Sequence, residues 1–259
     1  MAQLFCQNLS LFAKLFLDNK SVFFNVTGFN YFLLVYTPPT PDPLIDPTTG
    51  EVDETPPPPR GTIVGFFSKE KMSWDNNNLA CILIFPPWQR KGLGALLMGV
   101  SYEISRREGL LGGPEKPISD LGKKGYKRFW EGEIARWLLS LKPDGGEVPI
   151  VDVAMCSQAT WIAPEDCLLV LREMNLAKET TKGPPLVKKR KVETEENGAG
   201  VRSGSPAEEE LVDRVQISQD DVMAWVTENG INLERPCDPG GFVEGYAIKT
   251  ESPMEEEAI

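Results

Sequence analysis

Residues 79–95 read LACILIFPPWQRKGLGA, and no other stretch of the 259-residue chain says more about its fold. The stretch begins with an apolar run of strand length and continues as a polar turn that contains Gly92 and Gly94. After the turn, apolar residues recur at helical spacing as far as Ile104, and Arg106 and Arg107 follow in the last turn. The sequence therefore predicts a strand, a glycine-rich turn and an amphipathic helix, in that order.

The predicted turn has the chemistry of a phosphate-binding site. A glycine-rich turn between a strand and a helix exposes backbone N–H groups at the helix N-terminus, where the helix dipole adds about half a positive charge. Arg90 and Lys91 place two further positive charges beside it. An ordinary connection between a strand and a helix would have the same pattern, so both interpretations stand at this point.

The composition limits the chemistry that the chain can perform. The chain has no histidine, which excludes Ser-His and Cys-His catalytic arrangements and most catalytic zinc sites. Its 5 cysteines are scattered without a CxxC pair, so no metal site is expected. Any general base must be a carboxylate or, less often, a lysine, tyrosine or cysteine. The formal net charge of -11 argues against a protein that coats DNA; it would suit a basic substrate or serve solubility alone.

The remaining elements follow from apolar patterns and turn residues. At 41% hydrophobic residues the chain can bury a sizeable core, and neither a membrane-spanning run nor a signal peptide is predicted. Strands are predicted over residues 9–17, 22–26, 29–36, 62–68 and 79–85, and further helices over residues 126–141, 164–171 and 215–226.

Two stretches of unusual composition divide the chain. Residues 37–60 are rich in proline, aspartate and threonine, and residues 178–214 are lysine-rich and then acidic. We therefore expect a folded core over residues 1–177 with a proline-rich insert at 37–60. A disordered linker is expected over 178–214, and a C-terminal segment that packs on the core and ends in an acidic tail over 215–259.

Several longer motifs carry a family resemblance. The Gln89-x-x-Gly92-x-Gly94 turn resembles the pyrophosphate-binding turn of the N-acetyltransferase superfamily. A narrower resemblance, to the MYST family of histone acetyltransferases, covers residues 6–176 and more loosely residues 217–246. It is carried, in the family's order, by AKLFLD (13–18), VGFFSKE (64–70), NLACIL (78–83), PWQRKGLG (87–94), SYEISRRE (101–108) and PEKPISDLG (114–122).

The resemblance implies an α/β fold of the N-acetyltransferase type, with a mainly antiparallel central sheet and a helical, winged-helix-like C-terminal segment. It implies a histone lysine acetyltransferase that uses acetyl-CoA and acts on histone tails or nucleosomes within a chromatin-modifying complex that regulates transcription. Contact with membranes or with specific nucleic-acid sequences is not expected. Two alternatives stay open: an inactive acetyl-CoA-binding or scaffold protein, and an acetyltransferase for a non-histone protein or a small amine.

The resemblance also assigns roles to residues. Glu115 matches the family's general base. Cys81 matches its active-site cysteine, for which packing beside the thioester and covalent transport of acetyl are both open. A base is needed because a free lysine, with a pKa near 10.4, is neutral in only about one molecule in 2,500 at pH 7, a cost of roughly 4.6 kcal/mol. Lys14 matches the lysine that family members acetylate on themselves. The residues expected along the cofactor are Ile82, Leu83, Ile84, Gln89, Arg90, Lys91, Gly92, Leu93, Gly94, Ala95 and Ser119.

The sequence departs from the family's pattern at several points. It begins after the position of the family's zinc finger, which predicts a fragment, a truncated reading frame or a derived member. Asn19 stands where many members have histidine, and Gly113 and Arg128 stand where many have serine. The inserts resemble those of fungal members of the "something about silencing" branch.

A compact basic cluster, VKKRKV at residues 187–192, lies in the predicted linker. Such a cluster is typical of a nuclear-import signal, although a solvated run of charge has the same composition. Together with the resemblance it predicts a nuclear protein.

Overall fold

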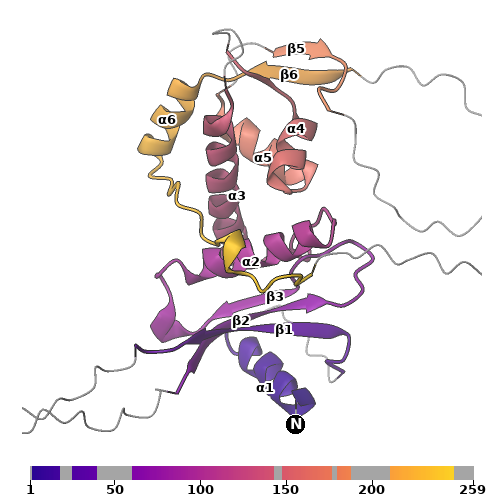
Figure 1. Cartoon of the computed structure of the whole chain (residues 1–259), viewed down its shortest axis with the longest axis vertical. Helices are drawn as coiled ribbons and strands as arrows, with labels where there is room; N and C mark the ends of the chain where they lie inside the picture. The colour runs from indigo at the N-terminus through magenta and orange to yellow at the C-terminus, as the bar shows by residue number, and fades with distance from the viewer. Residues whose placement is uncertain are drawn as a thin grey trace, which may run out of the picture.

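A computed structural model describes residues 2–17, 25–39, 60–142, 148–176, 180–187 and 211–247. The fold is α/β, as the sequence predicts. Figure 1 shows a three-stranded sheet near one end of the molecule, with helix α1 against one face and helix α2 against the other. Helix α3 leads away from this sheet toward a second, smaller sheet, and the remaining helices lie around α3.

The central sheet is antiparallel and has the order β1-β2-β3. Its strands are β1 (Phe29–Tyr36), β2 (Thr62–Glu70) and β3 (Cys81–Ile84), which confirms three of the predicted strands. Alternation along β2 supplies apolar side chains to both faces, since Phe66 belongs to one buried cluster and Phe67 to another. The sheet is therefore covered on both sides where β2 and β3 meet.

The prediction of a strand over residues 9–17 is wrong, because this segment belongs to α1 (Ala2–Lys14). Leu9 and Ala13 are four residues apart and are both buried, whereas Leu11 and Leu15 are exposed. This is the spacing of a helix that buries one narrow stripe. The density of apolar residues obscured the spacing. Residues 18–24, and with them most of the predicted strand at 22–26 and Asn19, lie outside the described residues.

Helix α2 (Leu93–Arg107) follows the glycine-rich turn as predicted. Helix α3 (Asp120–Ser140) begins six residues before the predicted start at Tyr126. The Ser119 hydroxyl caps it by accepting a hydrogen bond of 3.1 Å from the Gly122 backbone N–H. The early glycines of α3 hid this first turn from the apolar pattern, and the serine cap is the feature that marks it.

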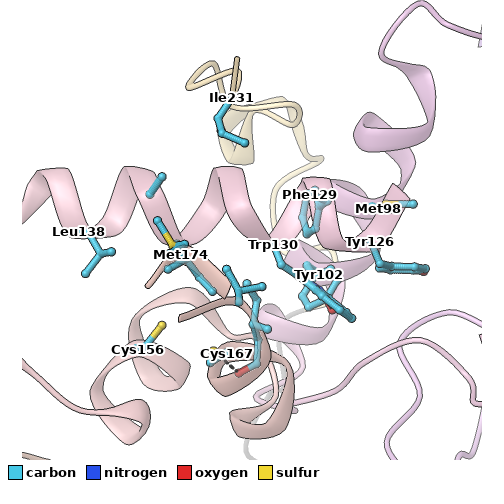
Figure 2. Packing of buried hydrophobic residues seen from close by; sticks show 14 of the residues in the cluster. Met98, Tyr102, Tyr126, Phe129, Trp130, Leu138, Cys156, Cys167, Met174 and Ile231 are labelled. Carbon is cyan, nitrogen blue, oxygen red and sulfur yellow. Dashed lines mark hydrogen bonds between the residues drawn. The ribbon is translucent and has the colours of Figure 1, made fainter. Parts of the chain in front are cut away.

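The main hydrophobic core lies where α2 and α3 meet the sheet and the later helices. Figure 2 shows Tyr102, Tyr126, Phe129 and Trp130 close together, with Leu138 farther along α3; the ring pairs Tyr102–Phe129 and Tyr126–Trp130 are tilted. The hydroxyl of Tyr102 accepts a buried hydrogen bond of 2.7 Å from the indole N–H of Trp130, so the aromatic cluster has a polar contact within it.

A second sheet of order β4-β6-β5 forms beyond α3. It consists of β4 (Ile150–Val151), β5 (Thr180–Gly183) and β6 (Val212–Gln216). Strand β5 and the start of β6 fall in the range predicted as a disordered linker. The sequence pattern missed them because strands this short and polar depend on their neighbours for stability. Residues 188–210 lie outside the described residues.

Three short helices complete the fold: α4 (Val153–Thr160), α5 (Pro164–Met174) and α6 (Gln219–Glu228). Helix α4 was not predicted, although Asp152 caps it by accepting from the Met155 N–H at 2.7 Å. The predicted helix from Val215 is wrong at its start, where the chain is still in β6. Val222 and Val226 of α6 lie in the main core.

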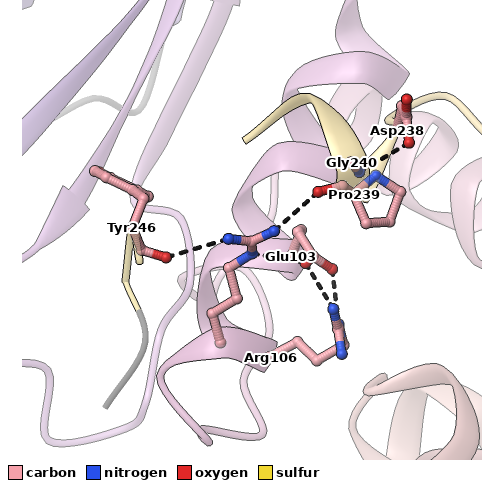
Figure 3. A network of polar contacts seen from close by, with 7 residues as sticks. Glu103, Arg106, Asp238, Pro239, Gly240 and Tyr246 are labelled. Carbon is pink, nitrogen blue, oxygen red and sulfur yellow. Dashed lines mark hydrogen bonds and ion pairs between the residues drawn. The ribbon is translucent and has the colours of Figure 1, made fainter. Parts of the chain in front are cut away.

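The segment after α6 is fastened to α2 by Arg107. Its guanidinium donates to the backbone carbonyls of Pro239 (2.8 Å) and Tyr246 (3.3 Å), forms an ion pair with Glu103, and lies over the Phe242 ring. Figure 3 shows the polar contacts around Glu103, next to the short 3-10 helix η2 (Pro239–Gly241). One side chain thus holds residues that are about 130 positions away in the sequence.

Arg107→Ala should destabilise the protein by about 2–3 kcal/mol, since it removes two hydrogen bonds from a charged donor, an ion pair and a cation–π contact. Amide hydrogen exchange should accelerate most between residues 236 and 247. The matched control is Arg106→Ala, because Arg106 is more exposed and, within the described part of the chain, its guanidinium pairs only with Glu103, which Arg107 also binds; its cost should stay below about 1 kcal/mol. Equal costs for both variants in urea titrations would contradict the role given to Arg107.

Candidate active site

The turn predicted to bind phosphate joins β3 to α2 through the short 3-10 helix η1 (Pro86–Trp88). The Gln89 side-chain amide donates to the Ile84 carbonyl at 2.8 Å, and the Lys91 ammonium lies 5.3 Å from the centre of the Trp88 ring. These contacts hold the polar end of the turn against the end of the strand.

The start of α2 is open. Gly92 is its N-cap with φ 77, a left-handed conformation that favours glycine, and no side chain caps the helix. At both Gly92 and Gly94 a methyl group would meet no atom within 4 Å. The start of α2 is therefore uncapped by side chains and uncrowded at both glycines, as a bound diphosphate requires. Gln89, Arg90 and Lys91 are exposed around them, and Leu93 and Ala95 are half-buried.

Strand β3 leads from this turn toward Glu115. Within the part of the chain that the structure describes, β3 has β2 as its one strand partner. Just before β3, Leu79 forms an isolated parallel bridge with Pro114, and the Glu115 N–H donates to the Leu79 carbonyl at 2.9 Å. The two segments then part, and the open edge of β3 carries Ile82, Leu83 and Ile84.

Cys81 and Glu115 come from two segments whose backbones meet at Leu79. Cys81 follows Leu79 by two residues and is 5% exposed, in a cluster with Leu9, Ala13, Phe66 and Leu83. Glu115 is exposed and sits directly beside Leu79 in the sheet. A small buried thiol and an exposed carboxylate thus flank the end of β3 that is farther from the glycine-rich turn.

Glu115 lines a pocket of about 580 Å³. The pocket lies between the loop after β2, the residues before α3, and the start of α5. Five of its side chains are carboxylates and one, Lys116, is a cation; the carboxylates are Glu70, Asp75, Glu115, Glu165 and Asp166. The fully exposed indole of Trp74 stands at its edge. The pocket is suited to a positively charged ligand.

Charges in the pocket are unevenly paired. The Lys116 ammonium lies 3.4 Å from the Glu165 carboxylate, and both side chains are exposed. Asp166 is instead buried, and this burial raises the pKa of its carboxyl above the ordinary value despite the attraction of Lys116. Behind the pocket, burial strongly raises the pKa of the Tyr126 hydroxyl, and the charge of the Cys81 thiolate would raise it further.

Among the predicted site residues, which all lie in the described ranges, only Glu115 lines this pocket; Cys81, Ser119 and Lys14 do not. Ser119 is exposed, and its side chain already caps α3. Lys14 is the exposed last residue of α1, and not part of a strand as expected; its neighbour Ala13 is buried in the cluster of Cys81. Arg128, which departs from the family's pattern, donates to the Asn229 carbonyl at 2.8 Å and also to the Gly230 carbonyl. It therefore fastens α3 to the end of α6.

Sequence reasoning missed Asp166 and Trp74 as pocket residues. Asp166 falls in the first turn of the helix predicted over residues 164–171, where an acidic residue stabilises the helix. No local pattern relates it to Glu115, because the two residues are brought together by the packing of α5 against the segment before α3.

No three His, Cys, Asp or Glu side chains are grouped as metal ligands within the described ranges. None of the described helices has the length and apolar character needed to cross a membrane.

Comparison with known proteins defines the class. Residues 1–216 match the MOZ/SAS family. The chain belongs to this family, and the resemblance to MYST proteins is thereby confirmed.

Three relatives illustrate the match. The chain is 41% identical over 173 residues to histone acetyltransferase SAS2 of Saccharomyces cerevisiae, covering 67% of this chain and 44% of that protein. It is 39% identical over 175 residues to histone acetyltransferase MOF of Drosophila melanogaster, covering 68% and 18%. It is 40% identical over 176 residues to histone acetyltransferase of the MYST family 1 of Arabidopsis thaliana, covering 67% and 34%. The matched part spans less than half the length of each.

Proposed function

We propose that the chain is the catalytic part of a histone acetyltransferase, which moves an acetyl group from acetyl-CoA to the side chain of a histone lysine. The observation that carries this proposal is the position of Glu115. It lies in an acidic pocket at one end of β3, while the open glycine-rich turn lies at the other end. A cofactor lying along β3 would connect the two.

The turn fits the diphosphate of the cofactor, because a side chain at Gly92 or Gly94 would fill the space in front of the uncapped helix. The residues Gln89 to Ala95 would hold the diphosphate, and Ile82, Leu83 and Ile84 would contact the pantetheine arm. Acetyl-CoA supplies an acetyl group activated as a thioester. Ser119 is proposed as a further cofactor contact, and Lys14 as a site of self-acetylation.

Glu115 is proposed as the general base. The acceptor lysine arrives as an ammonium, and Glu115 takes one proton so that the amine can act as nucleophile. The pocket's excess of carboxylates would attract a basic histone tail. Histone tails on nucleosomes are the proposed substrate, and subunits of a chromatin-modifying complex are the proposed partners.

The proposal is tested by incubating the purified chain and acetyl-CoA that carries labelled acetyl with core histones or, in parallel, with a mixture of non-histone nuclear proteins. The acceptor proteins are then analysed by mass spectrometry. Label on histone lysines is expected. Binding of acetyl-CoA without any transfer would instead support an inactive scaffold protein. Transfer confined to non-histone proteins would support an acetyltransferase for a non-histone protein.

We also propose a nuclear location for the protein, and this proposal rests on the basic cluster at residues 187–192. Residues 188–192 lie outside the described residues. Alanine at Lys188, Lys189, Arg190 and Lys191 should move a fluorescent fusion from the nucleus toward the cytoplasm in live-cell imaging. An unaltered nuclear distribution would mean that the cluster is only a charged linker or that a partner carries the protein in.

A further inference from the structure

Asp166 is the one buried carboxylate among the five that line the acidic pocket. The residue is 7% exposed, and its Oδ2 atom is buried without a hydrogen-bond partner. A buried carboxylate oxygen that lacks a donor costs free energy, so native proteins rarely keep one unless a ligand or water supplies the donor. Asp166 therefore has an unfilled place for a hydrogen-bond donor.

The unpaired oxygen lies beside Gly113, in the wall of the pocket. A methyl group at Gly113 would lie 3.5 Å from Asp166 Oδ2 and would meet no other atom within 4 Å outside its chain neighbours. Gly113 lines the same pocket as Asp166. Because Gly113 has no side chain, a small displacement of the pocket wall would bring the carboxylate oxygen into contact with a group that enters the pocket.

Glu115 lies on the same side of this segment. The Gly113 carbonyl accepts from the Asn78 N–H, and the Glu115 N–H donates to the Leu79 carbonyl, both at 2.9 Å, so the segment runs extended through the bridge at Pro114. In an extended segment, residues i and i+2 point to one side and are about 6.6 Å apart. The space in front of Asp166 and the side chain of Glu115 are therefore neighbours.

We propose that Asp166 binds the ammonium group of the acceptor lysine and holds it beside Glu115. The inference rests on the proposed function. An ammonium has three donors and a positive charge, and it would satisfy both the unpaired oxygen and the cost of the buried charge. Lys116 does not fill this role, since its ammonium is paired with Glu165. Proton transfer then breaks one N–H bond of the lysine and forms an O–H bond on Glu115.

The electrostatic surroundings of Asp166 agree with this assignment. Burial raises the pKa of the Asp166 carboxyl, Lys116 lowers it, and Glu165 raises it again. An additional cation next to Oδ2 would stabilise the ionised form. The charge of Asp166 is also felt by Tyr102 in the core behind it, where it helps to raise the pKa of the tyrosine hydroxyl.

Two peptides separate recognition of the ammonium from general binding. One is an arginine- and glycine-rich synthetic peptide with a single lysine, and the other has norleucine in place of that lysine. Wild type in the presence of CoA should bind the lysine peptide more tightly in calorimetry. Asp166→Asn should weaken binding of the lysine peptide by about 10- to 100-fold, the range for a hydrogen bond to a charged group, and should leave the norleucine peptide within about twofold. Asp220→Asn, the matched control, makes the same change in the first turn of α6, outside the pocket, and should change either affinity by less than about threefold.

Gly113→Ser provides a second test that leaves Asp166 in place. The serine hydroxyl can donate to Asp166 Oδ2 and occupy its free position. We expect a melting temperature equal to or above that of wild type, together with an affinity for the lysine peptide that is at least about fivefold weaker. If Asp166 is merely a structural residue, Gly113→Ser would stabilise the protein and leave the lysine affinity unchanged, and the inference is overturned.

The binding measurements are independent of turnover. An inactive wild type that still prefers lysine to norleucine through Asp166 would refute the proposed function and keep this inference. If wild type is active, and both Asp166→Asn and Gly113→Ser keep its preference for the lysine peptide over the norleucine peptide, the proposed function stands and the inference is refuted. A wild type that binds both peptides equally would also refute the inference.

Discussion

Glu115→Gln lowers the rate of acetyl transfer by about 100- to 10,000-fold at pH 7, the usual contribution of a general base. Glutamine has the shape of glutamate but cannot accept the proton of the lysine ammonium. Glu115 is exposed, and its backbone N–H bond to Leu79 is kept in the variant, so the fold should be unaffected. Its affinity for acetyl-CoA should be nearly that of wild type, because Glu115 lies at the lysine end of β3.

The pH dependence distinguishes a base from a residue that only binds substrate. As the pH rises toward the pKa of lysine, near 10.4, the neutral amine becomes abundant and needs no base. The ratio of the wild-type to the variant rate should therefore shrink steadily from pH 7 to pH 9.5. Glu165→Gln removes the same charge from the same pocket and should show no such trend. Full activity of Glu115→Gln at pH 7 would show that the mechanism is wrong.

Cys81→Ala belongs in the same series, because it distinguishes direct transfer assisted by Glu115 from a route through an acetyl-cysteine intermediate. Cys81 is buried among apolar side chains, which suits a residue that packs beside the thioester. The variant should keep substantial activity when the reaction starts from a preformed complex with acetyl-CoA. A folded Cys81→Ala protein that binds the cofactor but is inactive would instead favour an acetyl-cysteine intermediate.

The central part of the fold could be predicted from the sequence because its signals are local. The strand, glycine-rich turn and helix over residues 79–107 are each defined by short-range apolar spacing and by Gly92, whose φ of 77 suits glycine. Helix α1 could not be recognised in this way, because many apolar side chains in and just after it are exposed and hide the buried stripe of Leu9 and Ala13. The exposed ones are Leu4, Phe5, Leu11, Phe12, Leu15 and Phe16.

The pocket shows a different limit. Glu115 was identified through a motif, but Asp166 is 51 positions later and meets the same space only through the packing of α5. Its unusual property, a buried oxygen without a donor, is a property of the folded chain and leaves no mark in the local sequence. The turn and Glu115 can thus be found by sequence reasoning. Asp166, the proposed binding partner of the lysine ammonium, cannot.

Gly94→Glu should abolish acetyl-CoA binding while leaving the fold intact. Gly94 is the second residue of α2, where an acidic residue is favourable for the helix dipole, and a side chain there would meet no atom within 4 Å. The variant is therefore expected to melt at or slightly above the temperature of wild type. Gly92 is less suitable for the test, since its positive φ would strain any other residue.

The loss of binding has two causes that a matched control separates. The glutamate side chain fills the space that the diphosphate needs, and its charge repels the diphosphate at the helix N-terminus. Gly94→Gln has nearly the same volume without the charge, so it should bind acetyl-CoA more weakly than wild type but more tightly than Gly94→Glu. Isothermal calorimetry with acetyl-CoA should give no measurable heat for the glutamate variant, a loss of at least about 100-fold.

The same variants report where the cofactor lies relative to the lysine pocket. The acidic pocket is at the other end of β3, so a lysine peptide should bind Gly94→Glu about as well as it binds cofactor-free wild type. If Gly94→Glu kept wild-type affinity for acetyl-CoA, the diphosphate could not lie against the first turn of α2. The course of the cofactor along β3 would then have to be abandoned together with the roles of Gln89 to Ala95.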